Sequence, residues 1–261
     1  MGQLLICELK KLKRCNVFWI ILAGAFFSAF MTYVQFVMSK SVDNQVTNFM
    51  EFYMAAIWNN FFVAFPFSIT ITGGMIFNQE YSNATLKSIM TVPVSIKRLS
   101  FAKVIIIGVL TFILSLTNLI FVVIGAALLH LPEITTFHLI KSLLQICGIG
   151  MCIYISVLPL IIWGFRKVNG YYPMMCIAFM YGFCGNFLIP RGLGDYYPLT
   201  AGLRIIQYDV LPQGNNVVAY ITMLAVLLLS VLMIVFIPYS YEKAIHLKTK
   251  KKGKRNNVHK R

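Results

Sequence analysis

Residues 77–103 read FNQEYSNATLKSIMTVPVSIKRLSFAK, a polar segment that separates two long apolar runs. A connection that only reverses the chain between two helices needs about two to eight residues. This segment is much longer and carries its own helix signals. We therefore expect it to form a separate structural element that contacts something beyond the two apolar runs.

The middle of this segment has the pattern of a short amphipathic helix. Residues 82–83, Ser and Asn, favour a helix start because their side chains accept hydrogen bonds from first-turn amides, and Pro93 favours a helix end. Between them Leu86, Ile89 and Met90 fall on one face. Two interpretations remain open: this face sits in a groove of a partner protein, or it rests on lipid headgroups.

The composition is that of a polytopic membrane protein. Of the 261 residues, 59% are hydrophobic and 12% are charged, whereas soluble domains are about 25% charged. A helix needs about 20 residues to cross the hydrocarbon core of a bilayer. Six uncharged segments reach that length, namely 17–38, 54–77, 104–129, 142–163, 171–190 and 217–238. We therefore predict an all-α fold with six transmembrane helices.

The basic residues predict the orientation, because Lys and Arg are retained on the cytoplasmic side. With both termini in the cytoplasm, 19 of the 23 basic residues lie on that side. Residues 1–242 then form one transmembrane domain that begins with an interfacial helix, in which Leu5, Leu9 and Leu12 share a face, and residues 243–261 form a basic cytoplasmic tail. The net charge of +15 fits contact with anionic membrane lipids and gives no reason to expect nucleic acid.

The two longest outer connections differ in character. Residues 39–53 include Asp43 and Glu51 and predict an ordinary solvated loop. Residues 191–216 contain a helical run at 200–208 with an apolar face. This pattern predicts a loop that folds back into the outer leaflet.

Three amides, Asn59, Asn60 and Asn118, lie inside apolar segments. In lipid, amide side chains form hydrogen bonds across helices, and polar groups inside a bundle can also mark a transport pathway. Both interpretations remain open for these residues.

Several kinds of chemistry are missing from the sequence. The phosphate-binding pattern GxxxxGK[ST] does not occur, and neither do HExxH, GxSxG or a zinc-type Cys/His spacing. The six apolar segments contain no Asp, Glu, Lys or Arg, although ion-coupled carriers need such groups at membrane depth. We therefore expect no catalytic residue, bound cofactor or metal site in this chain, and we disfavour an ion-coupled carrier or an intramembrane enzyme.

The polar segment resembles the coupling region of ABC-2 type transporter permeases. The resemblance rests on Glu80 at the end of the second span, the run ATLK at 84–87, where Ala stands in place of a common Gly, then Pro93, and Lys103 at the start of the third span. It implies that ATPase coupling involves Glu80, Thr85, Leu86, Lys87, Ile89, Met90 and Pro93. It also implies cytoplasmic ABC ATPase subunits that hold ATP and Mg, and a second copy of the chain or a sister permease.

By its length, the chain is most similar to the small permeases of bacitracin and lantibiotic self-protection systems. This resemblance implies a bacterial plasma-membrane protein that exports or expels an amphipathic peptide antibiotic, as in bacteriocin immunity. A lipid or another amphiphile suits an uncharged path equally well. A membrane assembly or sensor subunit that transports nothing, or a channel independent of ATP, remains an alternative.

Overall fold

The computed structural model describes residues 2–12, 16–43, 48–82, 96–164, 171–208 and 214–235. Within these ranges every regular element is helical. The elements are α1 (Gly2–Leu12), α2 (Val17–Asp43), α3 (Phe49–Asn59), η1 (Asn60–Ala64), α4 (Phe65–Ser82), α6 (Ile96–Leu128), α7 (Thr136–Gly164), α8 (Tyr171–Leu188), η2 (Gly194–Tyr196), α9 (Pro198–Ile205) and a C-terminal helix, Asn216–Val235. The predicted coupling helix and the basic tail, residues 243–261, lie outside the described ranges.

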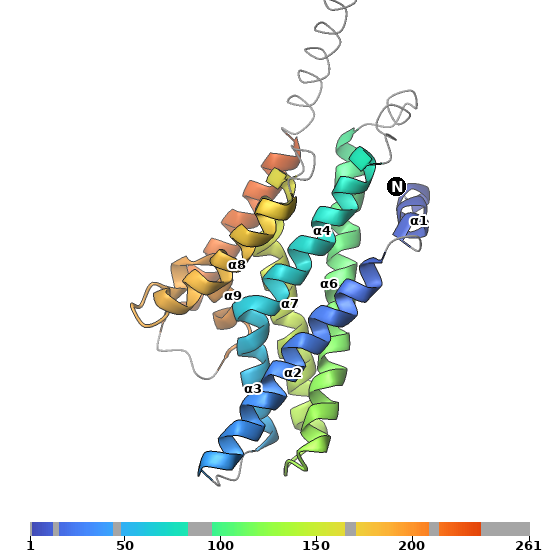
Figure 1. Cartoon of the computed structure of the whole chain (residues 1–261). Helices are drawn as coiled ribbons and strands as arrows, with labels where there is room; N and C mark the ends of the chain where they lie inside the picture. The colour runs from blue at the N-terminus through green and yellow to red at the C-terminus, as the bar shows by residue number, and fades with distance from the viewer. Residues whose placement is uncertain are drawn as a thin grey trace, which may run out of the picture.

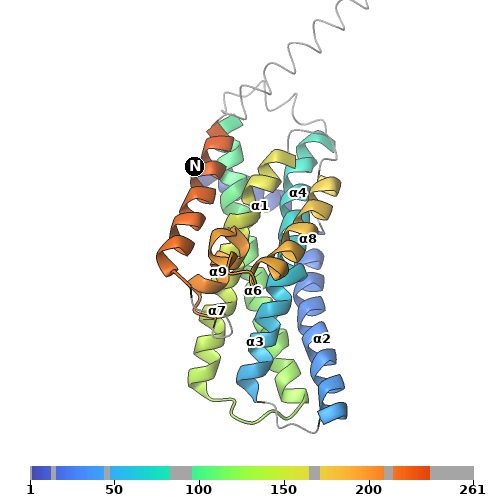
Figure 2. The same cartoon turned by 90° about the vertical axis from the view of Figure 1, so that its left-hand side faces the viewer.

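The long helices form a bundle of uneven height (Figure 1). The segments α2, α3, α6 and α7 reach one end of the bundle, whereas α8 and the C-terminal helix stop near its mid-height (Figure 2). The short helix α1 lies beside the opposite end, next to the starts of α2 and α6. That end also carries the last turns of α4 and the first turns of α6 (Figure 1).

Five described helices are long and apolar enough to cross a membrane: Val17–Ser39, Phe49–Asn78, Arg98–Leu128, Thr136–Gly164 and Asn216–Val235. Helix α8, which occupies the predicted fifth span, has 18 residues and is shorter. At 1.5 Å per residue, α8 is about 27 Å long, against a hydrocarbon core of about 30 Å. The polytopic all-α class is thus confirmed, and the sixth crossing stays a prediction.

The prediction of a solvated loop over residues 39–53 is wrong at both ends. Helix α2 continues to Asp43, and α3 begins at Phe49. Phe49, Phe52 and Tyr53 are fully buried, because their i, i+3, i+4 spacing places three aromatic rings on the inner face of one helix. Burial of these three rings stabilises the helix here, although the neighbouring Glu51 is charged.

Two other predicted spans begin earlier than expected. Helix α6 starts at Ile96 instead of 104, and α7 starts at Thr136 instead of 142. The expectation took charged residues as span ends, but α6 runs through Lys103 and α7 runs through Lys141. A helix can extend past the hydrocarbon core, so a lysine marks the membrane boundary and need not end the helix.

The predicted apolar face of α1 is only partly correct. Leu12 is buried and Leu5 packs against the core, but Leu9 is 48% exposed. Glu8 takes the inner position instead and forms an ion pair with Lys11, one turn further along the helix. The pairing explains how a carboxylate can occupy the inner side of this helix.

The loop after α8 contains the predicted helix, displaced slightly from residues 200–208. The buried side of α9 includes Leu199 and Leu203, and the hydroxyl of Tyr208 donates a hydrogen bond of 3.1 Å to the carbonyl oxygen of Met54. Helix α9 lies at the mid-height of the bundle (Figure 2). The described residues of this loop up to Tyr208 therefore pack into the bundle.

One π-turn, η1, joins α3 to α4 in a continuous helix. The N–H of Phe65 donates to the carbonyl of Asn60, five residues earlier. Pro66 follows and has no N–H to offer the carbonyl of Phe62, and a π-turn is one way in which a helix accommodates such a break. Gly182 of α8 packs at this point so closely that an added Cβ would collide with the Phe62 carbonyl oxygen.

Candidate functional site

Lys103 ties together the two helices from which the polar segment emerges. Its side chain is 1% exposed, and its ammonium donates a hydrogen bond of 2.8 Å to the carbonyl oxygen of Ile76 in α4. The same ammonium lies 5.3 Å from the centre of the Phe77 ring. A carbonyl and an aromatic face both stabilise a cation that has been removed from water. The end of α4 and the start of α6, which residues 83–95 connect in the chain, are therefore held together.

Few of the predicted coupling residues lie within the described part of the chain. Glu80 belongs to α4, in its last turn before Ser82, but its side chain lies outside the described atoms. The other predicted residues also fall outside: Thr85, Leu86, Lys87, Ile89, Met90 and Pro93. Their part in coupling stays a prediction.

Asn60 and Asn118 meet in the interior and connect three helices. Both are fully buried. The Asn60 amide nitrogen donates to the Asn118 side-chain oxygen at 2.7 Å, and the Asn118 amide nitrogen donates to the carbonyl oxygen of Ala25 at 2.9 Å. The Ser28 hydroxyl donates to the Asn60 side-chain oxygen. These contacts bond α2, η1 and α6 to one another.

Asn59, the neighbour of Asn60, lies in a different environment. Its amide nitrogen donates to the Thr32 hydroxyl at 2.9 Å and to the Gln35 side-chain oxygen at 3.0 Å. Asn59 is half-buried and Gln35 is exposed. Both consecutive asparagines thus contact α2, Asn60 at a fully buried position and Asn59 closer to the protein surface.

A polar pair that the sequence reasoning missed closes the loop between α8 and the C-terminal helix. Arg204 Nε lies 2.9 Å from Asp195 Oδ1, and the two side chains are 15% and 13% exposed. The Asn215 N–H donates to Asp195 Oδ2 at 2.8 Å, and the Thr222 hydroxyl donates to the Asp195 carbonyl at 3.2 Å. An arginine inside an apolar helical run needs a partner, and that signal pointed to an acidic residue nearby.

Buried polar contacts between helices, together with five helices that are long and apolar enough to cross a membrane, define a multi-pass membrane protein of the helical-bundle class. The profile of one family, described as ABC-2 family transporter protein, matches residues 4–185, which is more than half of the 261 residues. The chain therefore belongs to the ABC-2 transporter family. Neither a curated protein nor a solved structure matches the chain.

Membership of this family identifies the chain as a permease subunit of an ABC transporter that works with separate ATP-binding subunits. A permease of this family is the membrane component of the transporter and not itself the ATPase. The multi-pass architecture is consistent with a bacterial plasma membrane.

Proposed function

We propose that this permease exports or expels a hydrophobic or amphipathic substrate, such as a peptide antibiotic, with ATP and Mg held by the partner ATPase. The observation that carries the proposal is the hydrogen bond from Lys103 to the Ile76 carbonyl, which joins the end of α4 to the start of α6. Residues 83–95 connect these two helices in the chain, so a partner that binds this segment can move both helices.

In this mechanism the coupling helix contains Leu86, Ile89 and Met90 and binds an ATPase groove, with Glu80 and Thr85 positioning it. Movement of that helix shifts α4 and α6 together, because Lys103 links them. Helix α4 continues through the π-turn into α3, so the shift reaches the Asn60–Asn118 contact. Rigid helices can transmit small displacements over such lengths.

The same mechanism places six crossings in the membrane, with α8 as the fifth. The end of the bundle that carries α1 and Lys103 then faces the cytoplasm and the ATPase. The basic residues gathered at this end support that orientation.

A second permease, identical or related, completes the transport path in this proposal. The exposed amide of Gln35 and the half-buried Asn59 support it, because amides facing lipid tails at membrane depth are costly. These two amides bond each other, and a second chain or a polar pathway between two chains would shield this exposed pair from lipid. Asn60 and Asn118, which bond to each other inside the bundle, then hold the helices together.

The coupling role is tested by purifying the tagged chain from gently solubilised membranes with Leu86→Asp beside Leu86→Met as the matched control. We expect a P-loop ATPase to co-purify with the wild type and with Leu86→Met, and to be lost with Leu86→Asp, because a carboxylate cannot enter an apolar groove without a large desolvation cost. Size-exclusion profiles check that all three proteins remain folded. An ATPase retained by Leu86→Asp would contradict the coupling role.

The substrate class is tested by reconstituting the chain with its ATPase in proteoliposomes. We expect a lantibiotic peptide to stimulate ATP hydrolysis, with no stimulation by a scrambled soluble peptide of equal charge. Stimulation by a short-chain fluorescent lipid alone would replace the peptide by a lipid substrate. ATPase activity that responds to neither compound would favour the assembly or sensor role.

A further inference from the structure

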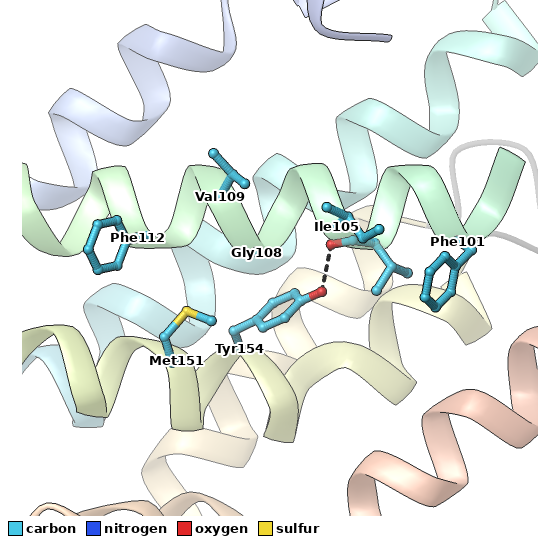
Figure 3. A pocket seen from close by; sticks show the side chains of 8 residues that line it. Phe101, Ile105, Gly108, Val109, Phe112, Met151 and Tyr154 are labelled. Carbon is cyan, nitrogen blue, oxygen red and sulfur yellow. Dashed lines mark hydrogen bonds between the residues drawn. The ribbon is translucent and has the colours of Figure 1, made fainter. Parts of the chain in front are cut away.

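A narrow apolar groove runs along the outside of the bundle between α6 and α7. Its volume is about 440 Å³. Four residues of α6 and two of α7 form most of its wall (Figure 3): Phe101, Ile105, Val109, Phe112, Met151 and Tyr154. It lies apart from the Asn60–Asn118 contact and from the Asp195–Arg204 pair.

The groove offers no hydrogen-bonding group to a ligand. Its one side-chain hydroxyl, on Tyr154, donates a hydrogen bond of 2.6 Å to the carbonyl oxygen of Val104 (Figure 3). The remaining lining atoms are apolar. A sugar, nucleotide or ion would lose its hydration here without gaining a hydrogen bond. An aliphatic chain, in contrast, has no hydrogen bonds to lose when it enters the groove.

One position in the wall of the groove carries no side chain. Gly108 is buried between the turns of α6 that carry Ile105 and Phe112. A Cβ at this position would lie 3.4 Å from Cε1 of Tyr154, which is an ordinary van der Waals contact. The backbone of α6 at Gly108 therefore packs close to the Tyr154 ring.

The length of the groove matches one leaflet of a bilayer. From Phe101 to Phe112 the helix rises by about 16 Å, at 1.5 Å per residue. Half of a hydrocarbon core is about 15 Å. The residues Phe101, Ile105, Val109 and Phe112 are between 40% and 49% exposed, so the groove opens toward the lipid and not into the bundle.

A positive charge lies at one end of the groove. Arg98 is exposed and precedes Phe101 by three residues, which places it on the same face of α6, one turn closer to the start of the helix. Lys97 adds a second positive charge in the sequence. Basic residues at the membrane boundary attract anionic headgroups, and a guanidinium binds phosphate through two hydrogen bonds.

We propose that this groove binds one acyl chain of an anionic membrane phospholipid, with the headgroup phosphate at Arg98. The apolar lining recognises the chain, the length selects a single leaflet, and the charge at one end selects the headgroup. This lipid stays bound to the permease and is distinct from the transported substrate.

The test uses the full-length chain in detergent, native mass spectrometry and dioleoyl phosphatidylglycerol as the probe. We expect one phosphatidylglycerol to bind more tightly than the others. Val109→Trp and Met151→Trp fill the groove from opposite walls, and each should weaken this binding about tenfold, because space for several methylenes is lost. Ile120→Trp adds the same bulk to the same face of α6, eleven residues further along, and should leave binding unchanged.

Two further variants separate the headgroup from the acyl chain. Arg98→Gln should reduce phosphatidylglycerol binding to the level of dioleoyl phosphatidylcholine, whereas Arg98→Lys should preserve most of the difference. Tyr154→Phe should bind the lipid as well as the wild type does, because its hydroxyl is not offered to a ligand.

Three results would overturn the proposal. Equal, statistical binding of both lipids to the wild type and to every variant would show only general lipid adhesion. Loss of binding in Tyr154→Phe would point to a polar ligand instead. A wild-type dimer that Val109→Trp splits into monomers, with no specific lipid, would show that a second copy of the chain covers the groove.

Discussion

Two membrane-length helices of this permease are built in opposite ways. In the helix Phe49–Asn78, 67% of the most apolar 18-residue stretch is buried inside the protein. The same helix has four polar residues at buried positions, namely Asn60, Ser68, Thr70 and Thr72. In Asn216–Val235, the most apolar of the five candidate spans in the described chain, only 22% of the window is buried. The more polar helix is thus the interior one.

The difference follows from the solvent. In water, apolar side chains drive a helix into the core. In a bilayer the lipid tails are as apolar as leucine, so apolar area alone does not favour burial, and hydrogen bonds with close packing hold helices together. The glycines, amides and hydroxyls of Phe49–Asn78 provide such contacts, whereas the C-terminal helix Asn216–Val235 contributes few hydrogen bonds or close contacts to the bundle. Burial in this chain is therefore better predicted by polar and small residues than by hydropathy.

The largest effect is expected where two helix backbones touch. Gly182→Val should destabilise the protein by about 3 kcal/mol, because a branched side chain must push α8 away from the Phe62 carbonyl. Thermal unfolding in detergent measures the loss. Met180→Val changes an exposed residue of the same helix and should have little effect. Equal stability of the two variants would mean that α8 does not pack against the π-turn.

The next largest effect concerns the Asp195–Arg204 pair. Asp195→Ala should cost about 2 kcal/mol, less than a fully buried pair, because both side chains keep some exposure. The double variant with Arg204→Met should cost less than the sum of the two single changes, since no uncompensated charge remains. Unfolding of the four proteins in the cycle gives the coupling energy. A coupling energy near zero would show that the pair does not hold the loop.

A smaller effect is expected for the buried amides. Asn118→Leu should cost about 1.5 kcal/mol, because it removes the acceptor of Asn60 and the donor to Ala25. Thr117→Val is the matched control, since the Thr117 hydroxyl donates to the carbonyl of Ile113 in its own helix and, among the described residues, bonds no other helix. Stability curves in one detergent compare the two. If Thr117→Val costs as much as Asn118→Leu, the bonds between helices contribute nothing extra.

The smallest effect belongs to the lipid-facing helix. Leu228 is 53% exposed, and Leu228→Ala should change the unfolding free energy by less than about 0.5 kcal/mol, because lipid replaces the lost contacts. The same measurement applies here. A larger loss, accompanied by a change in oligomeric state, would show that this face binds a second permease.

Much of the fold could be predicted from the sequence. Runs of about 20 uncharged residues located five long helices, because a bilayer excludes charge over a fixed thickness. A helix within residues 200–208 was also expected from local residue types, and α9 lies close to that position. These features depend on composition and short-range spacing alone.

The sequence-based predictions were wrong where contacts between distant parts of the chain determine the local structure. The loop expected over residues 39–53 is partly helix because Phe49, Phe52 and Tyr53 fit a cavity that only the folded bundle provides. Likewise, nothing in the residue pattern could distinguish a pathway role from a packing role for the asparagines. The structure shows that Asn60 bonds to Asn118, a contact between residues far apart in the chain. The coupling segment was predicted from its pattern, and its role in coupling stays a prediction.

The π-turn also sets how this helix tolerates changes in chain length. Each residue of a helix turns the following side chains by about 100°. Removing one residue from Asn60–Ala64 would remove the extra residue of the π-turn. It would also rotate α3 relative to α4 about the helix axis. The Asn60–Asn118 contact and the packing of Gly182 against Phe62 could then no longer form together. Substitutions in this turn alter single contacts, whereas a deletion of one codon would misalign every contact beyond it. In the centre of this permease the number of residues is thus as constrained as their identity.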